Sequence, residues 1–133
     1  MATRAQIRRA LEQTVEFAVR EIAAELIPEL RRNTPKDTQY HSSRWVGAAG
    51  SPPASRPTPP TRGGRAAALS FAQQNASLAA VRTFRLGQGR VYVSNDGNYI
   101  NVLNAREGNF VLASANRAVA AAAPRINARA RSQ

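Results

Sequence analysis

The sequence predicts an α+β fold, and three observations along the chain predict it. Apolar residues recur at spacings of three and four from Thr3 to Leu30, which indicates a long amphipathic helix. Shorter helical patterns cover Ala66 to Val81 and Phe110 to Ala123. Between the helices, Trp45 to Ala48 is short enough to be a strand, and Arg90 to Ser94 alternates like one.

Composition restricts the kind of protein that this chain can be. Its 133 residues suit one domain, and a hydrophobic content of 43% permits a core. The absence of cysteine excludes disulfides and thiolate metal sites and favours an intracellular setting. No apolar run approaches the roughly 18 residues of a membrane span, and the arginine-rich N-terminus lacks the apolar block of a signal peptide. We therefore expect no membrane partner.

The net charge of +11 is concentrated in particular regions. Residues 38–95 contain seven arginines and no acid, and residues 108–133 contain four arginines and no acid. Among the cations only Lys36 is not arginine, and arginine pairs with phosphate and carboxylate in bidentate geometry. This pattern predicts a surface that meets a polyanion or an acidic protein. The alternative is a general enrichment of arginine that follows from genomic composition.

The first helix is expected to begin at a capping box made by Thr3 and Gln6. Glu16 and Arg20, on its polar face, have the spacing of an i,i+4 ion pair. Pro28 should kink or weaken the last turn, because it lacks a backbone donor. The face that we expect to meet the core has six members: Ile7, Leu11, Val15, Ala18, Ile22 and Leu26.

The next stretch, NTPKDTQYHSSRW, is expected to be a hinge between helix and sheet. Thr34 precedes Pro35, and a residue before proline disfavours helical backbone, so the helix should end there. Asp37 and Thr38 can bond their own backbone in a turn. Trp45 should then anchor the chain against the first helix.

The same stretch holds the residue types of a hydrolase, because Asp37 is followed by His41, Ser42 and Ser43. A catalytic triad needs such groups to converge in space around a nucleophile elbow, whereas these are sequence neighbours without elbow glycines. One histidine and no cysteine offer no metal-ligand cluster. The turn at 87–89 lacks the third glycine of a dinucleotide loop. We therefore predict no catalytic residue, no cofactor and no metal.

A proline-rich stretch, GSPPASRPTPPTRGG, runs from Gly50 to Gly64 and holds five of the eight prolines. Such a sequence should run extended, in part as polyproline II. It is either an exposed loop or an ordered arm that lies on a neighbouring subunit.

The segment after the second strand pattern is ambiguous. Asn95-Asp96-Gly97 could turn a hairpin into a strand at residues 98–102. It could equally cap a short helix that carries Tyr99, Val102 and Leu103 on one face. Gly108 should end whichever element forms.

The last helix is expected to place Phe110, Ala113 and Arg117 on one face and to end at Pro124. The basic residues beyond it should be mobile. The chain thus divides into a single domain, residues 1–123, and a basic tail, residues 124–133.

Several short motifs follow one another between the first and last helices. They are TPKDT at Thr34 to Thr38, Trp45, GSP at Gly50 to Pro52, VYVSN at Val91 to Asn95, and YINVLNAREG at Tyr99 to Gly108. Their order resembles the tail-completion, or neck, proteins of long-tailed bacteriophages and prophages, and it spans almost the whole chain. Gln39 departs from the family, which commonly has glycine there. The Gln-Ala-Pro that often follows Gly108 is missing, and the proline arm is longer than usual.

The resemblance implies an α+β subunit whose helices pack on a small mixed or antiparallel sheet, and it favours the strand–helix arrangement over the hairpin. It implies a ring of six copies, or twelve, at the head–tail junction of the virion, assembled in the host cytoplasm. The ring would surround the DNA and join the head connector or adaptor to the tail terminator or tube. The family is not enzymatic, so no small-molecule substrate is expected.

The resemblance also assigns roles to particular residues. Turn and anchor roles fall on Thr34, Pro35, Asp37, Thr38, Trp45, Tyr92, Asn95, Tyr99, Leu103 and Gly108. The arginines expected to face the lumen or a neighbouring subunit are Arg56, Arg62, Arg65, Arg125, Arg129 and Arg131. The alternative function is that of a free-standing basic protein that contacts nucleic-acid phosphates without sequence specificity.

Overall fold

The computed structural model describes residues 1–34, 40–53, 71–97 and 100–132. In this part of the chain the elements are α1 (Arg4–Asn33), α2 (Tyr40–Ser43), β1 (Trp45–Ala49), α3 (Phe71–Arg82), the 3-10 turn η1 (Leu86–Gln88), β2 (Val91–Asn95), α4 (Ile100–Arg106) and α5 (Phe110–Arg131). The expected α+β class is therefore confirmed.

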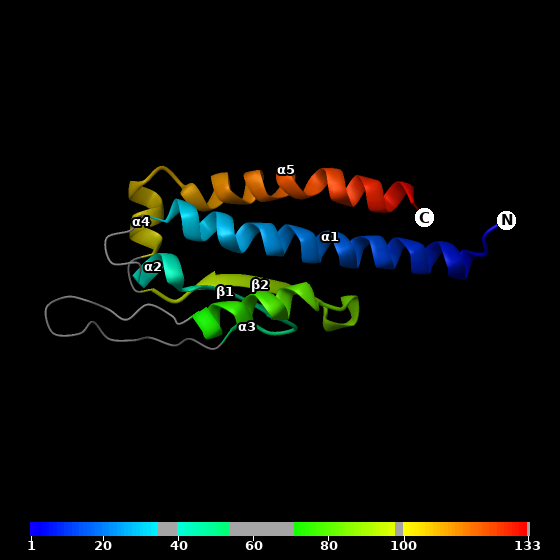
Figure 1. Cartoon of the computed structure of the whole chain (residues 1–133), viewed down its shortest axis with the longest axis horizontal. Coiled ribbons are helices and arrows are strands. Elements are labelled where there is room, and N and C mark those ends of the chain that lie inside the picture. Colours follow the sequence, from blue (N-terminus) through cyan, green and yellow to red (C-terminus); the bar gives the residue numbers. More distant parts are fainter. Residues whose placement is uncertain (35–39, 54–70, 98–99, 133) are drawn as a thin grey trace, which may run out of the picture.

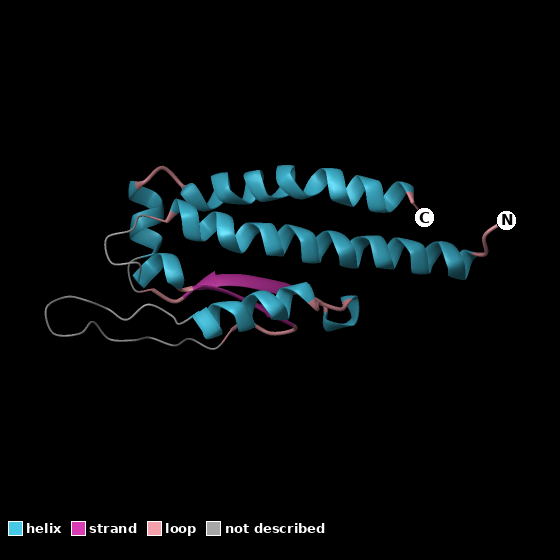
Figure 2. Cartoon of the chain, in the orientation of Figure 1, coloured by secondary structure: helices cyan, strands magenta, loops and turns pink. Residues whose placement is uncertain are grey.

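Helix α1 is the central element of the molecule. It has α5 antiparallel along one side and the sheet with α3 on the other (Figure 1). Helices α2 and α4 lie at one end, and both termini lie at the opposite end, where α1 extends beyond the end of α5 (Figure 1). Figure 2 shows how little of the described fold is strand: the β1–β2 pair lies against structure that is otherwise mostly helical.

The two strands form an antiparallel pair in which Trp45 lies opposite Asn95 and Gly47 opposite Val93. Of the two alternatives, the hairpin is not formed, because β2 pairs with the earlier strand β1 and is followed by helix α4. The turn that follows β2 is local: the Asn95 side chain accepts a hydrogen bond of 2.8 Å from the Gly97 N–H. The strand–helix arrangement that the resemblance favours is therefore the one present.

Trp45 lies against the end of α1, as predicted. Thr34 caps the end of α1 in an extended conformation, with φ −72° and ψ 131°, as expected of a residue before proline. The Trp45 indole N–H donates a 2.8 Å hydrogen bond to the Thr34 hydroxyl, and the ring is buried with Leu30 and Phe110. Pro35, Asp37 and Thr38 lie outside the described residues, as do Tyr99 and the proline arm from residue 54 onward.

A second core cluster joins α1 to α3 through β1. Ala23 and Ile27 of α1 meet Val81 of α3, and Gly47 lies between the two helices. A Cβ atom at Gly47 would collide with the Val81 side chain, so this position holds α3 close to the strand. The Gly47 N–H also donates to the Ser77 hydroxyl, which satisfies a buried backbone group.

The N-terminal half of the predicted core face of α1 is exposed. Ile7 and Leu11 keep 51% and 63% of their accessible surface, and Val15 is also exposed. The physical reason is that α1 runs past the elements that cover it (Figure 1). The buried residues of α1 are Ala23, Ile27 and Leu30, which lie in its C-terminal half.

The prediction that Pro124 ends the last helix is wrong, because α5 continues to Arg131. Residues on both sides of Pro124 are held against the rest of the chain: Ala122 is buried, and Arg125 lies 2.7 Å from Glu21 and 2.8 Å from Glu25. The basic tail is thus helical through its described length. Pro28 likewise lies inside α1, which continues to its end at Asn33.

The buried face of α5 also differs from the expectation. Its buried members follow one another at spacings of four: Phe110, Ser114, Ala118 and Ala122. Arg117 is exposed and Ala113 is only half-buried, so the core face is turned by one position from the predicted one. Gly108, with φ +75°, comes between α4 and α5 as predicted.

Candidate interaction surfaces

The residues that suggested hydrolase chemistry do not form a site in the described structure. Ser42 and Ser43 are buried, while Asp37 and the His41 side chain lie outside the described residues. In the described ranges, no group of three or more histidine or acidic side chains could hold a metal ion. Of the helices that the structure describes, none combines the length and apolarity needed to cross a bilayer.

Arg44 belongs to the interior, although the charge pattern predicts a basic surface for its region. Only 1% of it is exposed, and its Nε lies 2.5 Å from the Asp96 carboxylate. A second contact of 3.3 Å joins Nη2 to the other carboxylate oxygen. The pair ties the residue before β1 to the residue after β2. One feature of the sequence points to this ion pair, because Asp96 is the first acid after the long acid-free region that contains Arg44.

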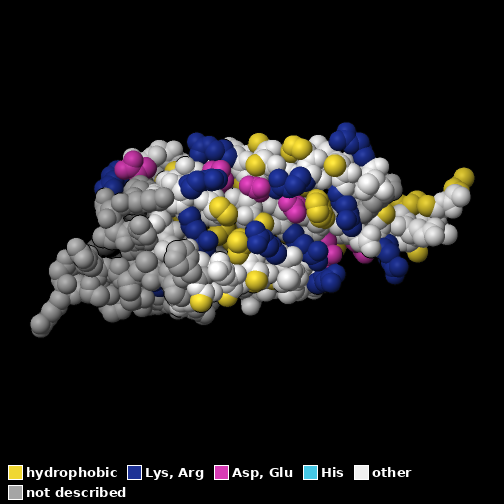
Figure 3. Space-filling model, in the orientation of Figure 1, with side chains coloured by type: hydrophobic (Ala, Val, Ile, Leu, Met, Phe, Trp, Pro, Cys, Tyr) yellow, Lys and Arg dark blue, Asp and Glu magenta, His cyan; other side chains and the backbone are white. Residues whose placement is uncertain are grey.

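Ion pairs within α1 and between α1 and α5 occupy the polar side of α1. Glu16 lies 3.4 Å from Arg20, as the i,i+4 spacing predicts, and it also accepts a hydrogen bond from the Leu86 N–H. Arg125 bridges Glu21 and Glu25, and these two hydrogen bonds raise the pKa of its guanidinium. Figure 3 shows one face of the molecule with arginine and acidic side chains close together along the helices.

The predicted lumen arginines therefore differ in their surroundings. Arg125 pairs with acids of its own chain, and Arg129 lies 5.4 Å from the centre of the Phe17 ring, in a cation–π arrangement. Arg131 is exposed at the end of α5. Arg56, Arg62 and Arg65 lie outside the described residues, so the expectation for them stays a prediction.

The turn and anchor residues are brought together only in part. Thr34 and Trp45 are hydrogen-bonded, and Asn95 lies opposite Trp45 across the strand pair. Tyr92 lies opposite Ala48 and is half-buried. Helix α4 contains Leu103, whose side chain lies outside the described set.

One apolar strip runs along α5 beside the buried face of that helix, and it is partly exposed. We call it the α5 stripe and define it as Leu112, Ala115, Val119, Ala123 and Ile126. Leu112 and Val119 expose 56% and 49% of their surface, and Ile126 is half-buried. These three recur every seven residues, which places them on one face over about four turns. This strip was not predicted, although the seven-residue spacing of Leu112, Val119 and Ile126 is visible in the sequence.

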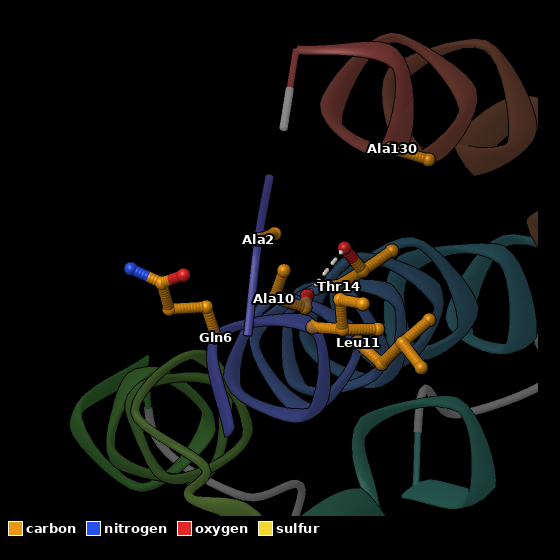
Figure 4. A pocket seen from close by; sticks show the side chains of 7 residues that line it. Ala2, Gln6, Ala10, Leu11, Thr14 and Ala130 are labelled. Atoms are coloured by element: carbon orange, nitrogen blue, oxygen red, sulfur yellow. Dashed lines mark hydrogen bonds between the residues drawn. The ribbon is translucent and has the colours of Figure 1, made fainter. Parts of the chain in front are cut away.

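A groove lies where the first turns of α1 meet the last turn of α5. This terminal groove has a volume of about 340 Å³ and is lined by Ala2, Gln6, Ile7, Ala10, Leu11, Thr14 and Ala130. Figure 4 shows Ala10 and Thr14 on the side of α1 toward Ala130, with Gln6 directed away. The Thr14 hydroxyl donates 3.0 Å to the Ala10 carbonyl, so this polar group is already satisfied (Figure 4).

Comparison of the chain with known protein families, with curated proteins and with solved structures found no match.

Proposed function

We propose that this chain is a structural subunit of the head–tail junction of a long-tailed bacteriophage. In this role six copies, or twelve, form a ring around the DNA passage and link the head connector to the tail. The ordered motifs from Thr34 to Gly108 support the proposal, as does the strand that is followed by a helix at the expected place. The role is structural and non-enzymatic.

The observation that carries the proposal is the α5 stripe. Soluble monomers rarely leave a contiguous apolar strip uncovered along a helix, and a small chain gains stability by burying it in an oligomer. Ala115 and Ala123 lie between the larger side chains, and small residues let a second helix approach closely. A second copy of the chain is the occupant that a ring requires.

The excess of arginine supports the same role in a second way. Cationic, acid-free segments suit a channel that DNA crosses. They equally suit contact with the acidic faces of a portal, adaptor or tube protein. Arg56, Arg62 and Arg65 are the arginines for which this is proposed, together with the exposed Arg131. If replacing all four with alanine leaves ring assembly and the yield of DNA-filled particles unchanged, this part of the proposal fails.

Ring formation can be tested with the purified full-length chain. Light scattering after gel filtration should give roughly 86 kDa for a ring of six chains of 14.4 kDa each. Electron microscopy of the same fraction should show closed rings. Replacing Leu112 and Val119 with glutamine should lower the mass toward that of one chain, because both side chains lie on the α5 stripe.

The matched control is Ala120→Gln, an exposed position of α5 outside the stripe, which should leave the mass unchanged. Glutamine is a good helix former, so all variants should keep the circular dichroism of the parent chain. A chain that stays monomeric up to about 1 mM would contradict ring formation by this surface. So would a stripe variant whose mass equals that of the control.

The second candidate is a free-standing nucleic-acid-binding protein, which the net charge of +11 favours. It predicts that affinity for duplex DNA falls steeply and linearly with the logarithm of salt concentration. The junction subunit should instead bind short duplexes feebly even at low salt. Titration of a labelled duplex at several salt concentrations therefore separates the two functions.

A further inference from the structure

The terminal groove offers apolar surface that the chain itself does not cover. Ile7 and Leu11 are more than half exposed along its wall, and Ala2, Ala10 and Ala130 add small apolar side chains. The polar side chains of the wall already have partners. Thr14 bonds to the Ala10 carbonyl, and Gln6 takes part in the capping box with Thr3. An occupant must therefore bring apolar side chains of its own.

Positive charge lies on the same turns of α1 and α5 as this groove, although no arginine lines it. Arg4, Arg8 and Arg9 lie on the first two turns of α1, and Arg131 lies on the last turn of α5. All four are exposed, and none forms an ion pair with another described residue. The first turn of α1 contains no acid, so the positive end of its helix dipole is not offset locally. The groove thus favours an occupant with negative charge.

A second copy of the chain has little negative charge to contribute. Six of the seven acids in the described part already form ion pairs: Glu16, Glu21, Glu25, Glu29, Asp96 and Glu107. Only Glu12 does not, and it lies on the same cationic segment of α1. Two copies meeting at this groove would place arginines against arginines. Among the described residues, no acid outside this segment lacks an ion pair, which points to a different protein as the source of the complementary charge.

Nucleic acid would satisfy the arginines but not the groove. A phosphate backbone brings no apolar group to cover Ile7 and Leu11, which would stay exposed to water. A helix with leucine-like residues on one face and acids beside them satisfies both features. The exposed stretch from Ile7 to Val15 is about 12 Å long, which matches roughly two turns of such a helix.

We propose that the terminal groove binds an acidic amphipathic helix of a partner protein other than this chain. The partner would be a neighbouring protein of the virion, and this identification rests on the proposed function. The binding itself depends on different residues from ring formation. Variants of the α5 stripe test the ring, and variants of the groove test the partner helix.

The probe is a synthetic helical peptide of about 20 residues with leucines at spacings of three and four and glutamates elsewhere. Fluorescence anisotropy of the labelled peptide with the full-length chain should show saturable binding. A peptide with the same composition in scrambled order should bind at least about tenfold more weakly, because it has the charge without the apolar face. A peptide with lysine in place of glutamate should not bind.

Two variants of the chain test the two features separately. Ile7→Gln with Leu11→Gln keeps the charge and removes apolar surface, and it should weaken binding by about tenfold or more. Arg4→Gln with Arg8→Gln should weaken binding by a similar factor at low salt and by less as salt rises. Leu112→Gln, on the distant α5 stripe, is the control and should leave the affinity unchanged. Because the replaced side chains are exposed, circular dichroism should match the parent chain.

Three results would overturn the proposal. The first is equal binding of the ordered and scrambled peptides, which would mean attraction by charge alone. The second is an unchanged affinity in the Ile7 and Leu11 variant. The third is a 20-base-pair duplex that displaces the peptide and loses affinity on substitution of Arg4 and Arg8 but not of Leu11, which would assign the surface to nucleic acid.

Discussion

Arg44 and Asp96 show how a single buried charge decides local stability. Asp96→Asn would remove the carboxylate that lies 2.5 Å from the buried Arg44 guanidinium. We expect the free energy of unfolding to fall by about 3 kcal/mol, which urea denaturation would measure.

The double variant Arg44→Met with Asp96→Asn is the informative comparison. It removes the charge together with its partner, so it should be more stable than Asp96→Asn alone. A double variant that is destabilised by the sum of the two single effects would show that the pair does not act as a unit.

Thr34 and Trp45 form a buried hydrogen bond between the end of α1 and the start of β1. Thr34→Val removes the hydroxyl that accepts the buried indole N–H and should cost about 1 to 3 kcal/mol. Because Trp45 is the only tryptophan, its fluorescence reports the change directly. The Thr34 hydroxyl itself donates to the Leu30 carbonyl, four residues back. Thr83→Val is the control, because the Thr83 hydroxyl likewise donates to the Ala79 carbonyl but is exposed. Equal losses in the two variants would contradict a special role for the hinge.

Gly47 is required by close packing rather than by its backbone conformation. In Gly47→Ala the new methyl group would collide with the Val81 side chain and press on Ile27, which should cost about 1 to 3 kcal/mol. Gly87→Ala should cost far less, because nothing lies within 4 Å of a Cβ atom there. Thermal unfolding of the two variants, side by side, measures the difference.

At the scale of elements, α5 contains a proline that its packing tolerates. Pro124→Ala restores a backbone donor within the helix, and it should raise the free energy of unfolding by about 1 kcal/mol or more. The gain is limited because proline also restricts the unfolded chain. Urea denaturation measures it, and a loss of stability would mean that the ring of Pro124 makes a contact that matters.

Element boundaries that depend on neighbouring residues were predictable from sequence. The capping box of Thr3 and Gln6, the end of α1 before Pro35 and the turn at Gly89 are all present, because each is fixed within a few residues.

Features that depend on distant partners were not predictable. A periodic apolar face does not say which element covers it, so the exposure of Leu11 required the structure. Pro124 ends a helix by local rules, but Glu21 and Glu25 of α1 hold the chain beyond it. Burial of Arg44 depends on an acid 52 positions away. The α5 stripe and the terminal groove belong to the same class.

At the scale of the whole molecule, the chain has many more cations than acids to pair with them. Most of the described acids already have arginine partners, so the remaining cations repel one another across the surface. Added salt screens this repulsion, and the melting temperature should rise between about 20 and 500 mM sodium chloride. Differential scanning calorimetry would measure it, and a falling melting temperature would show that the ion pairs dominate.

The first turn of α1 and the last turn of α5 lie at the same end of the molecule (Figure 1), and the terminal groove lies between them. An affinity tag or fluorophore fused at either end would therefore hang beside the surface whose binding is to be measured. Removable tags avoid this interference. Since the chain has no cysteine, Ala105→Cys on α4, at the opposite end of the molecule, gives a unique attachment point for a dye.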